Sequence, residues 1–487
     1  MKYILTLDQG TTSSRAALID ENGQWISEGQ VPFRQIFPQP GWVEHDPEEI
    51  WQSVVESIRI CLSRVNVQKE SIKAIGITNQ RETVVLWDRK TSRPLYNAIV
   101  WQCRRTQKIC ENLRKKKKEK IFKAKTGLIL DPYFSGTKIH WLLKNIPQKS
   151  TSLAVGTIDS WLLWKLTGGQ SHKTDVSNAS RTLLMNLKTR KWDPELLKIL
   201  QIPDSILPEI CVSNDNFGST QGLQVLPDNI PITGMIGDQQ SALFGQTCFE
   251  AGEAKCTFGT GSFLLLNIGN TPSPSKSGSL TTMAWELKGQ KPIYAFEGGA
   301  FICGAAVQWL RDGLGLFEKS ADVENLASQV KNTDGVEFVP ALTGLGAPHW
   351  RPEARGVITG LTRGTTQAHI ARATLEAMAL QNVDLLVAMQ KDLKKKLKRL
   401  RVDGGASKNN LLMQLQADYL GLEVERPQNY ETTALGAAYL AGLGVGLFKD
   451  LKTIKKLWHS EKVFKVQMSS KQRSLRMQSW SQAVKKA

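Results

Sequence analysis

The fold is decided near the start of the chain, by the stretch Leu5-Thr-Leu-Asp8-Gln-Gly10-Thr-Thr-Ser-Ser-Arg15-Ala-Ala-Leu-Ile-Asp20. Two short apolar runs, at 3–7 and 16–19, flank a tight loop, and runs of this length around a glycine predict a β-hairpin. A further turn at 21–23 leads into another short strand over 24–27. The alternative interpretation is a polar hairpin turn that carries no ligand.

The chemistry of this loop suits a polyphosphate. Gly10 allows a ligand to approach the backbone closely, and the loop hydroxyls at Thr11, Thr12 and Ser13 are hydrogen-bond donors. Arg15 adds a guanidinium, and Asp8 at the strand end is a candidate ligand for hydrated Mg²⁺. The sequence contains no Gly-Lys-Ser/Thr of a P-loop, no His-Arg-Asp kinase loop and no Gly-x-Gly-x-x-Gly after a strand. Any ATP site therefore belongs to another architecture.

The bulk composition predicts a cytoplasmic, globular protein of at least two domains. The chain has 487 residues, of which 41% are hydrophobic and 22% charged. It begins with an apolar run too short for a signal peptide, and its longest weakly polar stretch, 437–448, is too short to span a membrane. The 7 cysteines form no Cys-x-x-Cys pair, so we expect reduced core residues and no zinc site.

The net charge of +18 is concentrated in part in two basic runs, 114–120 and 391–401. Both are candidate nucleic-acid patches, but no aromatic residues or recognition motif accompany them. The second run spaces Leu393, Leu397 and Leu400 at helical intervals, which predicts an amphipathic helix with a solvated basic face. We expect no nucleic-acid partner and no membrane insertion.

The pattern of the N-terminal hairpin returns in the second half of the chain. Residues 255–267 again read as strand, a turn of glycines and hydroxyl residues, and strand. Long helical patterns cover 48–63, 368–393, 410–420 and 432–443. This organisation predicts an α/β fold of two similar, ribonuclease H-like domains around a central cleft, over 1–247 and 248–487.

Two polar pairs follow predicted strands in the first half. Arg81-Glu82 lies between the strands of 71–88, where open α/β sheets usually bind ligands, and offers both donors and acceptors to a small polyol. The alternative is an ion pair without a functional role. Asp238-Gln239 follows an apolar strand and precedes a helical stretch, so Asp238 is a candidate for an N-cap or for a general base.

These motifs, in this order, resemble the FGGY family of carbohydrate kinases, which belongs to the actin, hexokinase and heat-shock ATPase superfamily. The resemblance extends from about residue 3 to 446. The motifs at 71–88, 99–106 and 126–138 resemble the branch that phosphorylates glycerol. That branch implies transfer of the γ-phosphoryl group of MgATP to glycerol, giving sn-glycerol 3-phosphate and ADP, and a homo-oligomer, either a dimer or a tetramer.

The resemblance also implies roles for individual residues. Asp238 becomes the general base, and the glycerol site is formed by Arg81, Glu82, Trp101, Tyr133, Asp238, Gln239 and Phe263. Either aromatic at 101 or 133, taken singly, is more often explained by core packing than by ligand contact. The implied nucleotide contacts are Thr11, Thr12, Ser13, Arg15, Thr260, Gly304, Gln308, Gly405 and Asn409, with Asp8 at the metal.

One segment departs from the family pattern. Residues 217–233 contain no Arg or Lys and lack the Gly-rich loop with an Arg that binds fructose 1,6-bisphosphate in some members. We therefore expect no allosteric inhibition by that sugar. Three rival functions remain at this point: a kinase for another polyol or sugar, an ATP-driven switch or scaffold on the same fold, and a basic nucleic-acid-binding protein.

Overall fold

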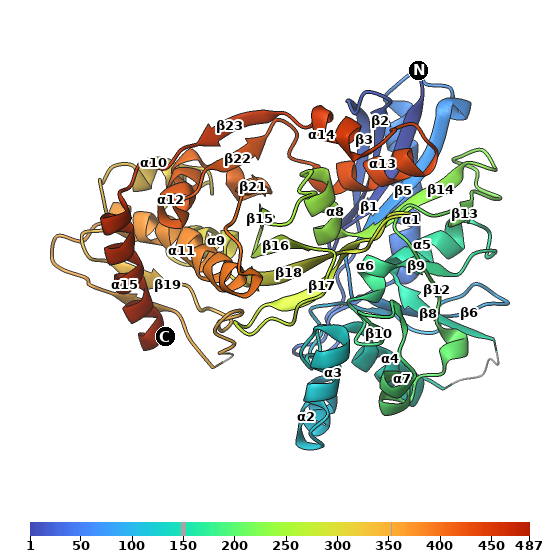
Figure 1. Ribbon diagram of the computed structural model, residues 1–487, viewed down its shortest axis with the longest axis horizontal. Helices are drawn as coiled ribbons and strands as arrows, with labels where there is room; N and C mark the ends of the chain where they lie inside the picture. Colours follow the sequence, from blue (N-terminus) through green and yellow to red (C-terminus); the bar gives the residue numbers. More distant parts are fainter. Residues whose placement is uncertain (148–151, 352) are drawn as a thin grey trace.

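A six-stranded mixed sheet forms the centre of the first half of the molecule (Figure 1). The structure is a computed structural model that describes residues 1–147, 152–351 and 353–487. The sheet has the order β13-β14-β5-β1-β2-β3, with β1 antiparallel to β2 and parallel to β5. Its strands are β1 (Tyr3–Gln9), β2 (Ser13–Asp20), β3 (Trp25–Pro32), β5 (Ile72–Asn79), β13 (Gly218–Ser219) and β14 (Pro231–Gly237). The predicted N-terminal hairpin is confirmed.

A seven-stranded sheet repeats this arrangement in the second half. Its order is β17-β18-β16-β15-β21-β22-β23, and β15 is antiparallel to β16 and parallel to β21, as β1 is to β2 and β5. Its strands are β15 (Glu253–Phe258), β16 (Ser262–Gly269), β17 (Leu280–Trp285), β18 (Ile293–Ala300), β21 (Arg399–Asp403), β22 (Val424–Pro427) and β23 (Ser460–Phe464). The second hairpin predicted from the sequence echo is therefore also present.

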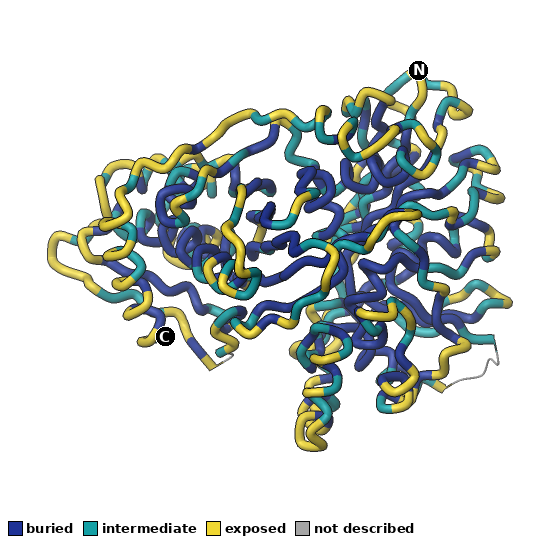
Figure 2. The backbone as a smooth tube through the Cα atoms, in the orientation of Figure 1, coloured by how far each residue is buried: buried dark blue, intermediate teal, exposed yellow. Residues whose placement is uncertain are grey.

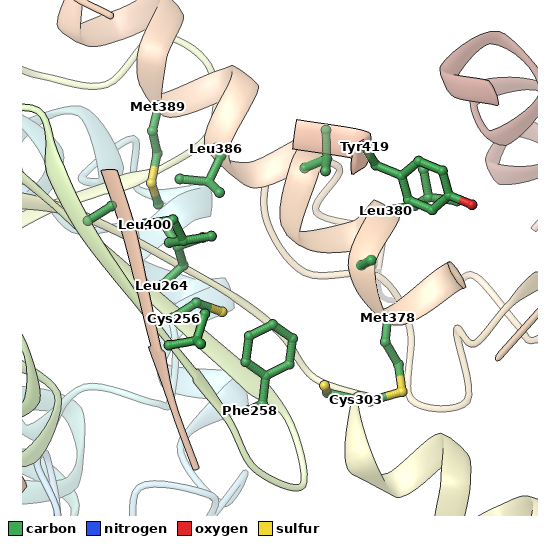
Figure 3. Close-up of a cluster of buried hydrophobic side chains, with 14 of the residues drawn as sticks. Cys256, Phe258, Leu264, Cys303, Met378, Leu380, Leu386, Met389, Leu400 and Tyr419 are labelled. Carbon is green, nitrogen blue, oxygen red and sulfur yellow. The ribbon is translucent and has the colours of Figure 1, made fainter. Parts of the chain in front are cut away.

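Helices cover both sheets. On the first sheet, α1 (Pro47–Ser63) packs on β2 and β3, and α13 (Thr432–Gly444) packs on β1, β5 and β14. On the second sheet, α11 (Gln367–Leu393) packs on β16 and β18 and against α12 (Asn410–Leu420). Figure 3 shows this second core, in which Leu386 and Met389 of α11 lie over the strand residues Leu264 and Leu400, and Met378 points toward Cys303. The tube in Figure 2 is accordingly buried through both centres and exposed at the periphery.

Two helices cross at the junction of the halves. Residues of α8 (Asp238–Gly245) contact α13, although α13 lies almost two hundred residues later in the chain. A Cβ at Gly245 would lie 1.9 Å from the carbonyl oxygen of Thr432, and one at Gly436 would lie 2.0 Å from that of Ser241. Only glycine permits such a close backbone approach. The crossing therefore fixes the start of α8, and with it Asp238, against both halves.

A smaller sheet, β4-β7-β6-β8, extends the first half below the central sheet. It comprises β4 (Glu44–His45), β6 (Val84–Asp88), β7 (Ala98–Ile99) and β8 (Leu153–Thr157), and the helices around it are α2 (Gln107–Lys115), α3 (Glu119–Thr126), α4 (Ser135–Asn145), α5 (Ile158–Leu166), α6 (Val176–Ala179) and α7 (Pro194–Leu200). The remaining elements are β9 (Lys173–Asp175), β10 (Met185–Asn186), β11 (Lys191–Trp192), β12 (Glu209–Cys211), β19 (Glu337–Val339), β20 (Val357–Thr359), α9 (Gly304–Asp312), α10 (Asp322–Ala327), α14 (Leu451–Leu457), α15 (Ser470–Lys486) and three short 3₁₀ turns at 69–71, 204–206 and 405–408.

The predicted amphipathic helix over 391–401 is wrong. Helix α11 ends at Leu393, Lys394 adopts a left-handed backbone with φ 54°, and β21 begins at Arg399. Parallel pairing with β15 buries Leu400 completely inside the second sheet. Tertiary pairing has overridden a helical spacing of leucines that was too short to be specific.

The remaining composition-based expectations can be compared with the described residues directly. All seven cysteines are buried and unpaired, as expected for core residues. Within the ranges that the structure covers, no helix is both long and apolar enough to cross a membrane. The basic run 114–120 lies where α2 gives way to α3, and most of its side chains are exposed.

Candidate active site

The residues expected to bind the acceptor come together between the two large sheets. Arg81 and Glu82 follow the carboxyl end of β5, and Asp238 and Gln239 follow that of β14, its neighbour in the sheet. Two loops of the first half add Trp101 and Tyr133, whose rings lie 5.6 Å apart, edge to face. From β16 of the second half, Phe263 approaches Trp101 at 6.4 Å between ring centroids. Parallel neighbours end at the same sheet edge, which explains why these distant motifs converge.

Arg81 is held by a carboxylate that the sequence motifs did not identify. Its Nη1 donates to Glu297 Oε2 at 2.6 Å and its Nη2 to Glu297 Oε1 at 2.8 Å, a bidentate pair. Nη1 also donates to Gln240 at 3.0 Å and Nη2 to the Tyr133 hydroxyl at 3.3 Å. Glu297 lies in the middle of β18, so an anion of the second half fixes a cation of the first half. The only sequence signal was a single charged residue inside the apolar strand 293–300.

A second unpredicted residue, Arg181, completes this buried cluster. Its Nε donates to Glu82 Oε1 at 2.7 Å, and its Nη2 donates to Glu297 Oε1 at 3.0 Å. The guanidinium carbon lies 5.6 Å from the centroid of the Tyr133 ring and 5.1 Å from that of Phe134, where the ring faces stabilise a cation. The side chains of Arg81, Glu82, Arg181 and Glu297 are each at most 3% exposed. We call these four residues the buried tetrad.

The backbone of Glu82 is strained. Its φ is 62°, in the left-handed region that a residue with a side chain adopts only at a cost. The Glu82 carbonyl accepts hydrogen bonds from Ser135 Oγ at 3.2 Å and from Lys138 Nζ at 3.1 Å. Lys138 also donates to the Tyr133 carbonyl at 2.5 Å, and burial lowers the pKa of this fully buried amine to about 7. The Lys138 amine is therefore hydrogen-bonded to the backbone carbonyls of both Glu82 and Tyr133, two residues expected to contact the acceptor.

Asp238 is the first residue of α8, and Gly237 is its N-cap, so the alternative of Asp238 as an N-cap does not hold. Asp238 Oδ1 accepts the Gln239 backbone N–H at 2.6 Å and lies 3.1 Å from Arg81 Nε. Burial raises the pKa of this carboxyl, while Arg81 and Lys255 act in the opposite direction. A carboxylate with a raised pKa is a better proton acceptor, which is what a general base needs.

Lys255 orients the neighbouring Gln239. This buried amine, on β15, donates to Gln239 Oε1 at 2.5 Å and to Thr257 Oγ1 at 2.8 Å, and its burial lowers its pKa. With Oε1 engaged, the Gln239 side chain presents its NH₂ group as the donor. Within the described parts of the chain, no hydrogen bond reaches Glu82 Oε2 or Asp238 Oδ2. The site thus offers two carboxylate acceptors and one amide donor beside a cluster of aromatic rings.

The residues expected to contact the nucleotide lie on the two hairpins and on the ends of α9 and α12. In the first hairpin, Gly10 N–H donates to the Ser13 carbonyl at 2.9 Å, closing a turn whose tip carries Thr11 and the exposed Thr12. In the second hairpin, Thr260 is exposed, and its carbonyl accepts the Cys303 N–H at 2.9 Å at the start of α9. That helix begins at Gly304 and carries the exposed Gln308.

The third nucleotide segment follows β21. Gly404 has φ 84°, and a Cβ there would lie 2.6 Å from the Phe258 carbonyl oxygen, whereas a Cβ at Gly405 would meet open space. Asn409 is the N-cap of α12 and accepts the Leu412 N–H at 2.8 Å, as its predicted position at a helix start requires. Before these glycines, the Asp403 carboxylate accepts hydrogen bonds from Thr257, Gln246 and Thr432, and so connects the second hairpin to α8 and α13.

Asp8 and Arg15 lie on opposite sides of the first hairpin's turn. Burial raises the pKa of Asp8 to about 7. The negative charges of Glu431 and Asp238 also act to raise it, whereas the positive charge of Arg15 acts to lower it. Nearby carboxylates of this kind favour a divalent cation, and Mg²⁺ usually takes one or two of them together with substrate phosphates. The described residues contain no cluster of three or more metal-binding side chains. Arg15 is ion-paired with Glu431 at the start of α13.

Comparison with known proteins shows the family to which the chain belongs. The family model described as "FGGY family of carbohydrate kinases, N-terminal domain" matches residues 3–245, and that of the C-terminal domain matches 254–445. The chain belongs to the FGGY family of carbohydrate kinases. The fold prediction of two α/β domains of the actin and hexokinase type is thereby confirmed, as is the resemblance on which the site residues were chosen.

Individual FGGY family members are similar over their full length. A glycerol kinase of Bdellovibrio bacteriovorus is 65% identical over 99% of both chains, and one of Oceanobacillus iheyensis is 53% identical over 99% of this chain and 97% of its own. Among solved structures, Plasmodium falciparum glycerol kinase with ADP aligns with a TM-score of 0.94 at 40% identity, covering 100% of this chain and 98% of its own.

Proposed function

We propose that this chain is a glycerol kinase, which transfers the γ-phosphoryl group of ATP to glycerol and forms sn-glycerol 3-phosphate and ADP. The observation that carries the proposal is that two carboxylates, those of Asp238 and Glu82, lie at the same edge of one sheet. Among the residues that the structure describes, none donates a hydrogen bond to the second oxygen of either carboxylate, and the NH₂ group of Gln239 is the neighbouring donor. Full-length relatives named glycerol kinase support the choice of acceptor.

A three-carbon triol matches this set of groups. Asp238 Oδ2 would accept the proton of the attacking hydroxyl and orient its oxygen toward the γ-phosphorus, and orientation is most of what phosphoryl transfer requires. Glu82 Oε2 would accept a hydrogen bond from a second hydroxyl, and Gln239 Nε2 would donate to an acceptor hydroxyl oxygen. Trp101 and Phe263 would cover the carbon chain and exclude water, the competing nucleophile.

Arg81 enters this scheme in a different way than expected. Its terminal nitrogens already donate to Glu297, Gln240 and Tyr133, so it is not a free donor for the acceptor. Its role in the proposal is to hold Asp238 and the Tyr133 hydroxyl in place. Any hydrogen bond from Arg81 to a substrate hydroxyl would be shared with the long 3.3 Å bond from its Nη2 to the Tyr133 hydroxyl.

The nucleotide would lie mainly against the second half, residues 248–487, with the acceptor and the base in residues 1–247. Backbone and hydroxyl donors at 11–13 and at Thr260 suit the phosphates, and Gly304, Gln308, Gly405 and Asn409 suit the nucleoside. When Mg²⁺ is bound, Asp8 would hold it through water, and the ion would neutralise charge on the β- and γ-phosphates. Arg15 would exchange its contact with Glu431 for a phosphate oxygen.

A coupled assay of ADP release with MgATP and a panel of acceptors tests the proposal. Glycerol should give the highest kcat/KM among glycerol, erythritol, xylulose and gluconate. A preference for one of the other acceptors would instead identify a kinase for another polyol or sugar within the family. ATP turnover that no acceptor stimulates would favour an ATP-driven switch. We also propose a homo-oligomer, a dimer or tetramer, which light scattering of the purified protein would test.

A further inference from the structure

Glu297 and Arg181 have no place in the proposed reaction as described so far, yet they hold two residues of the acceptor site, Arg81 and Glu82, through short charge-assisted hydrogen bonds. Glu297 uses both oxygens on Arg81, at 2.6 and 2.8 Å, and Oε1 also accepts from Arg181 at 3.0 Å. Arg181 in turn holds Glu82 Oε1 at 2.7 Å. Each of these side chains is nearly inaccessible to solvent, so water cannot replace a lost partner.

The charges explain why the cluster is stable in a buried place. Burial acts to raise the pKa of Glu297, but the guanidiniums of Arg181 and Arg81 outweigh it and hold that pKa at about 2. Glu297 is therefore an anion throughout the working pH range. Two cations and two anions alternate around the tetrad, which compensates the cost of removing each of them from water.

The geometry fixes which atoms remain for a substrate. Because Arg181 occupies Glu82 Oε1, the second oxygen of that carboxylate is the one left free. Because the Glu297 carboxylate accepts hydrogen bonds from both terminal nitrogens of Arg81, the guanidinium plane is fixed. In this orientation Arg81 Nε lies 3.1 Å from Asp238 Oδ1. The strained backbone at Glu82 cannot impose these orientations alone, since its side chain would remain free to rotate.

We propose that Glu297 and Arg181 are positioning residues of the acceptor site, which hold Arg81 and Glu82 so that Glu82 Oε2 and Asp238 Oδ2 face the acceptor. Glu297 belongs to β18, so the second half of the chain shapes the acceptor site as well as the nucleotide site. This inference rests on the proposed function, because it assigns the orientation of the groups that bind glycerol.

Steady-state kinetics of Glu297→Gln and Arg181→Met test the proposal. Both variants should raise the KM for glycerol by about tenfold or more, because a substrate hydroxyl that loses a well-placed hydrogen bond to a charged group binds roughly tenfold or more weakly. The KM for ATP should stay within about twofold of wild type, since neither residue approaches the nucleotide segments. Arg181→Lys keeps the charge and should recover part of the glycerol affinity that Arg181→Met loses.

The chain offers a matched control in Glu337→Gln. Glu337 on β19 accepts from Arg476 at 2.6 Å and from Ser479 at 2.7 Å, in a largely buried ion pair, 10% and 15% exposed at its two side chains, that joins β19 to α15 in the outer part of the second half. This control should lower thermal stability without changing either KM. If Glu297→Gln fails to fold, the charge-balanced double variant Arg181→Met/Glu297→Gln carries the same test.

The possible results separate the two proposals. A wild-type enzyme that does not use glycerol refutes the proposed function. A wild-type enzyme that uses glycerol, with an unchanged glycerol KM in a folded Glu297→Gln or double variant, overturns the positioning role alone. The same holds if the KM values for glycerol and ATP rise together, or if Glu337→Gln changes glycerol affinity as much as Glu297→Gln does.

Discussion

Replacing Asp238 by Asn should remove most of the catalytic rate while leaving the fold intact. The amide oxygen can still accept the Gln239 N–H, which Oδ1 now accepts at 2.6 Å, and Arg81 keeps its bidentate bond to Glu297. What is lost is the proton acceptor at Oδ2. Loss of a general base typically costs about 10²–10⁴-fold in rate. That range corresponds to roughly 2.7–5.4 kcal/mol of transition-state stabilisation.

The assay is kcat from ADP release at saturating glycerol and MgATP, with thermal unfolding and glycerol binding measured on the same preparation. Asp418→Asn is a suitable control, because Asp418 is a buried carboxylate that accepts the Gln467 and Met468 N–H groups in the second half. We expect Asp418→Asn to retain wild-type kcat. A folded Asp238→Asn enzyme with wild-type kcat would refute the assignment of Asp238 as the base.

Four further outcomes are expected. Trp101→Ala should raise the KM for glycerol far more than that for ATP in steady-state assays, because its ring lies on the acceptor side of the site; the reverse pattern would exchange the two sites. Fructose 1,6-bisphosphate should not inhibit at moderate salt, because the segment 217–233 has no cationic side chain and the Gly222 N–H already donates to the Asp228 carboxylate at 2.7 Å. Saturable inhibition in an activity titration would contradict this. Gly245→Ala should lower the thermal midpoint, with a cost of about 1–3 kcal/mol for forcing α8 and α13 apart; an unchanged midpoint would show that the crossing is not tight. Burial lowers the pKa of His45 to about 4, below its value in the unfolded chain. The free energy of unfolding should therefore be highest above about pH 6.5 and fall by up to ~1.4 kcal/mol per pH unit from there to about pH 4. In chemical denaturation, His45→Gln should show a weaker dependence of this free energy on pH, and an equally steep dependence would exclude His45 as its source.

Much of the site could be predicted because its residues follow strands with recognisable local patterns. The hairpin around Gly10, the strand before Asp238 and the Gly-Gly turn at 404–405 each combine an apolar run with a glycine or a polar loop. The adjacency of β5 and β14 then brings the acceptor motifs together at one sheet edge. Local sequence is sufficient wherever a strand end itself carries the functional group.

The buried tetrad and the end of α11 could not be predicted in the same way. Glu297 and Arg181 stand alone in their own segments, and only long-range packing shows that each compensates a charge from elsewhere in the chain. The spacing of Leu397 and Leu400 is compatible with a helix, but pairing of β21 with β15 decides the outcome. In both cases the determining interaction joins distant parts of the chain, 99 positions apart for Arg181 and Glu82 and 216 for Arg81 and Glu297.

If the proposed function is correct, the γ-phosphoryl group of ATP is transferred to a hydroxyl of glycerol. Phosphorus NMR of a reaction containing the wild-type protein, MgATP and glycerol measures this transfer directly. We expect a phosphomonoester signal of glycerol 3-phosphate that grows in equal amount to ADP and is absent without glycerol. Inorganic phosphate released in step with ADP, with no glycerol phosphate formed, would contradict it.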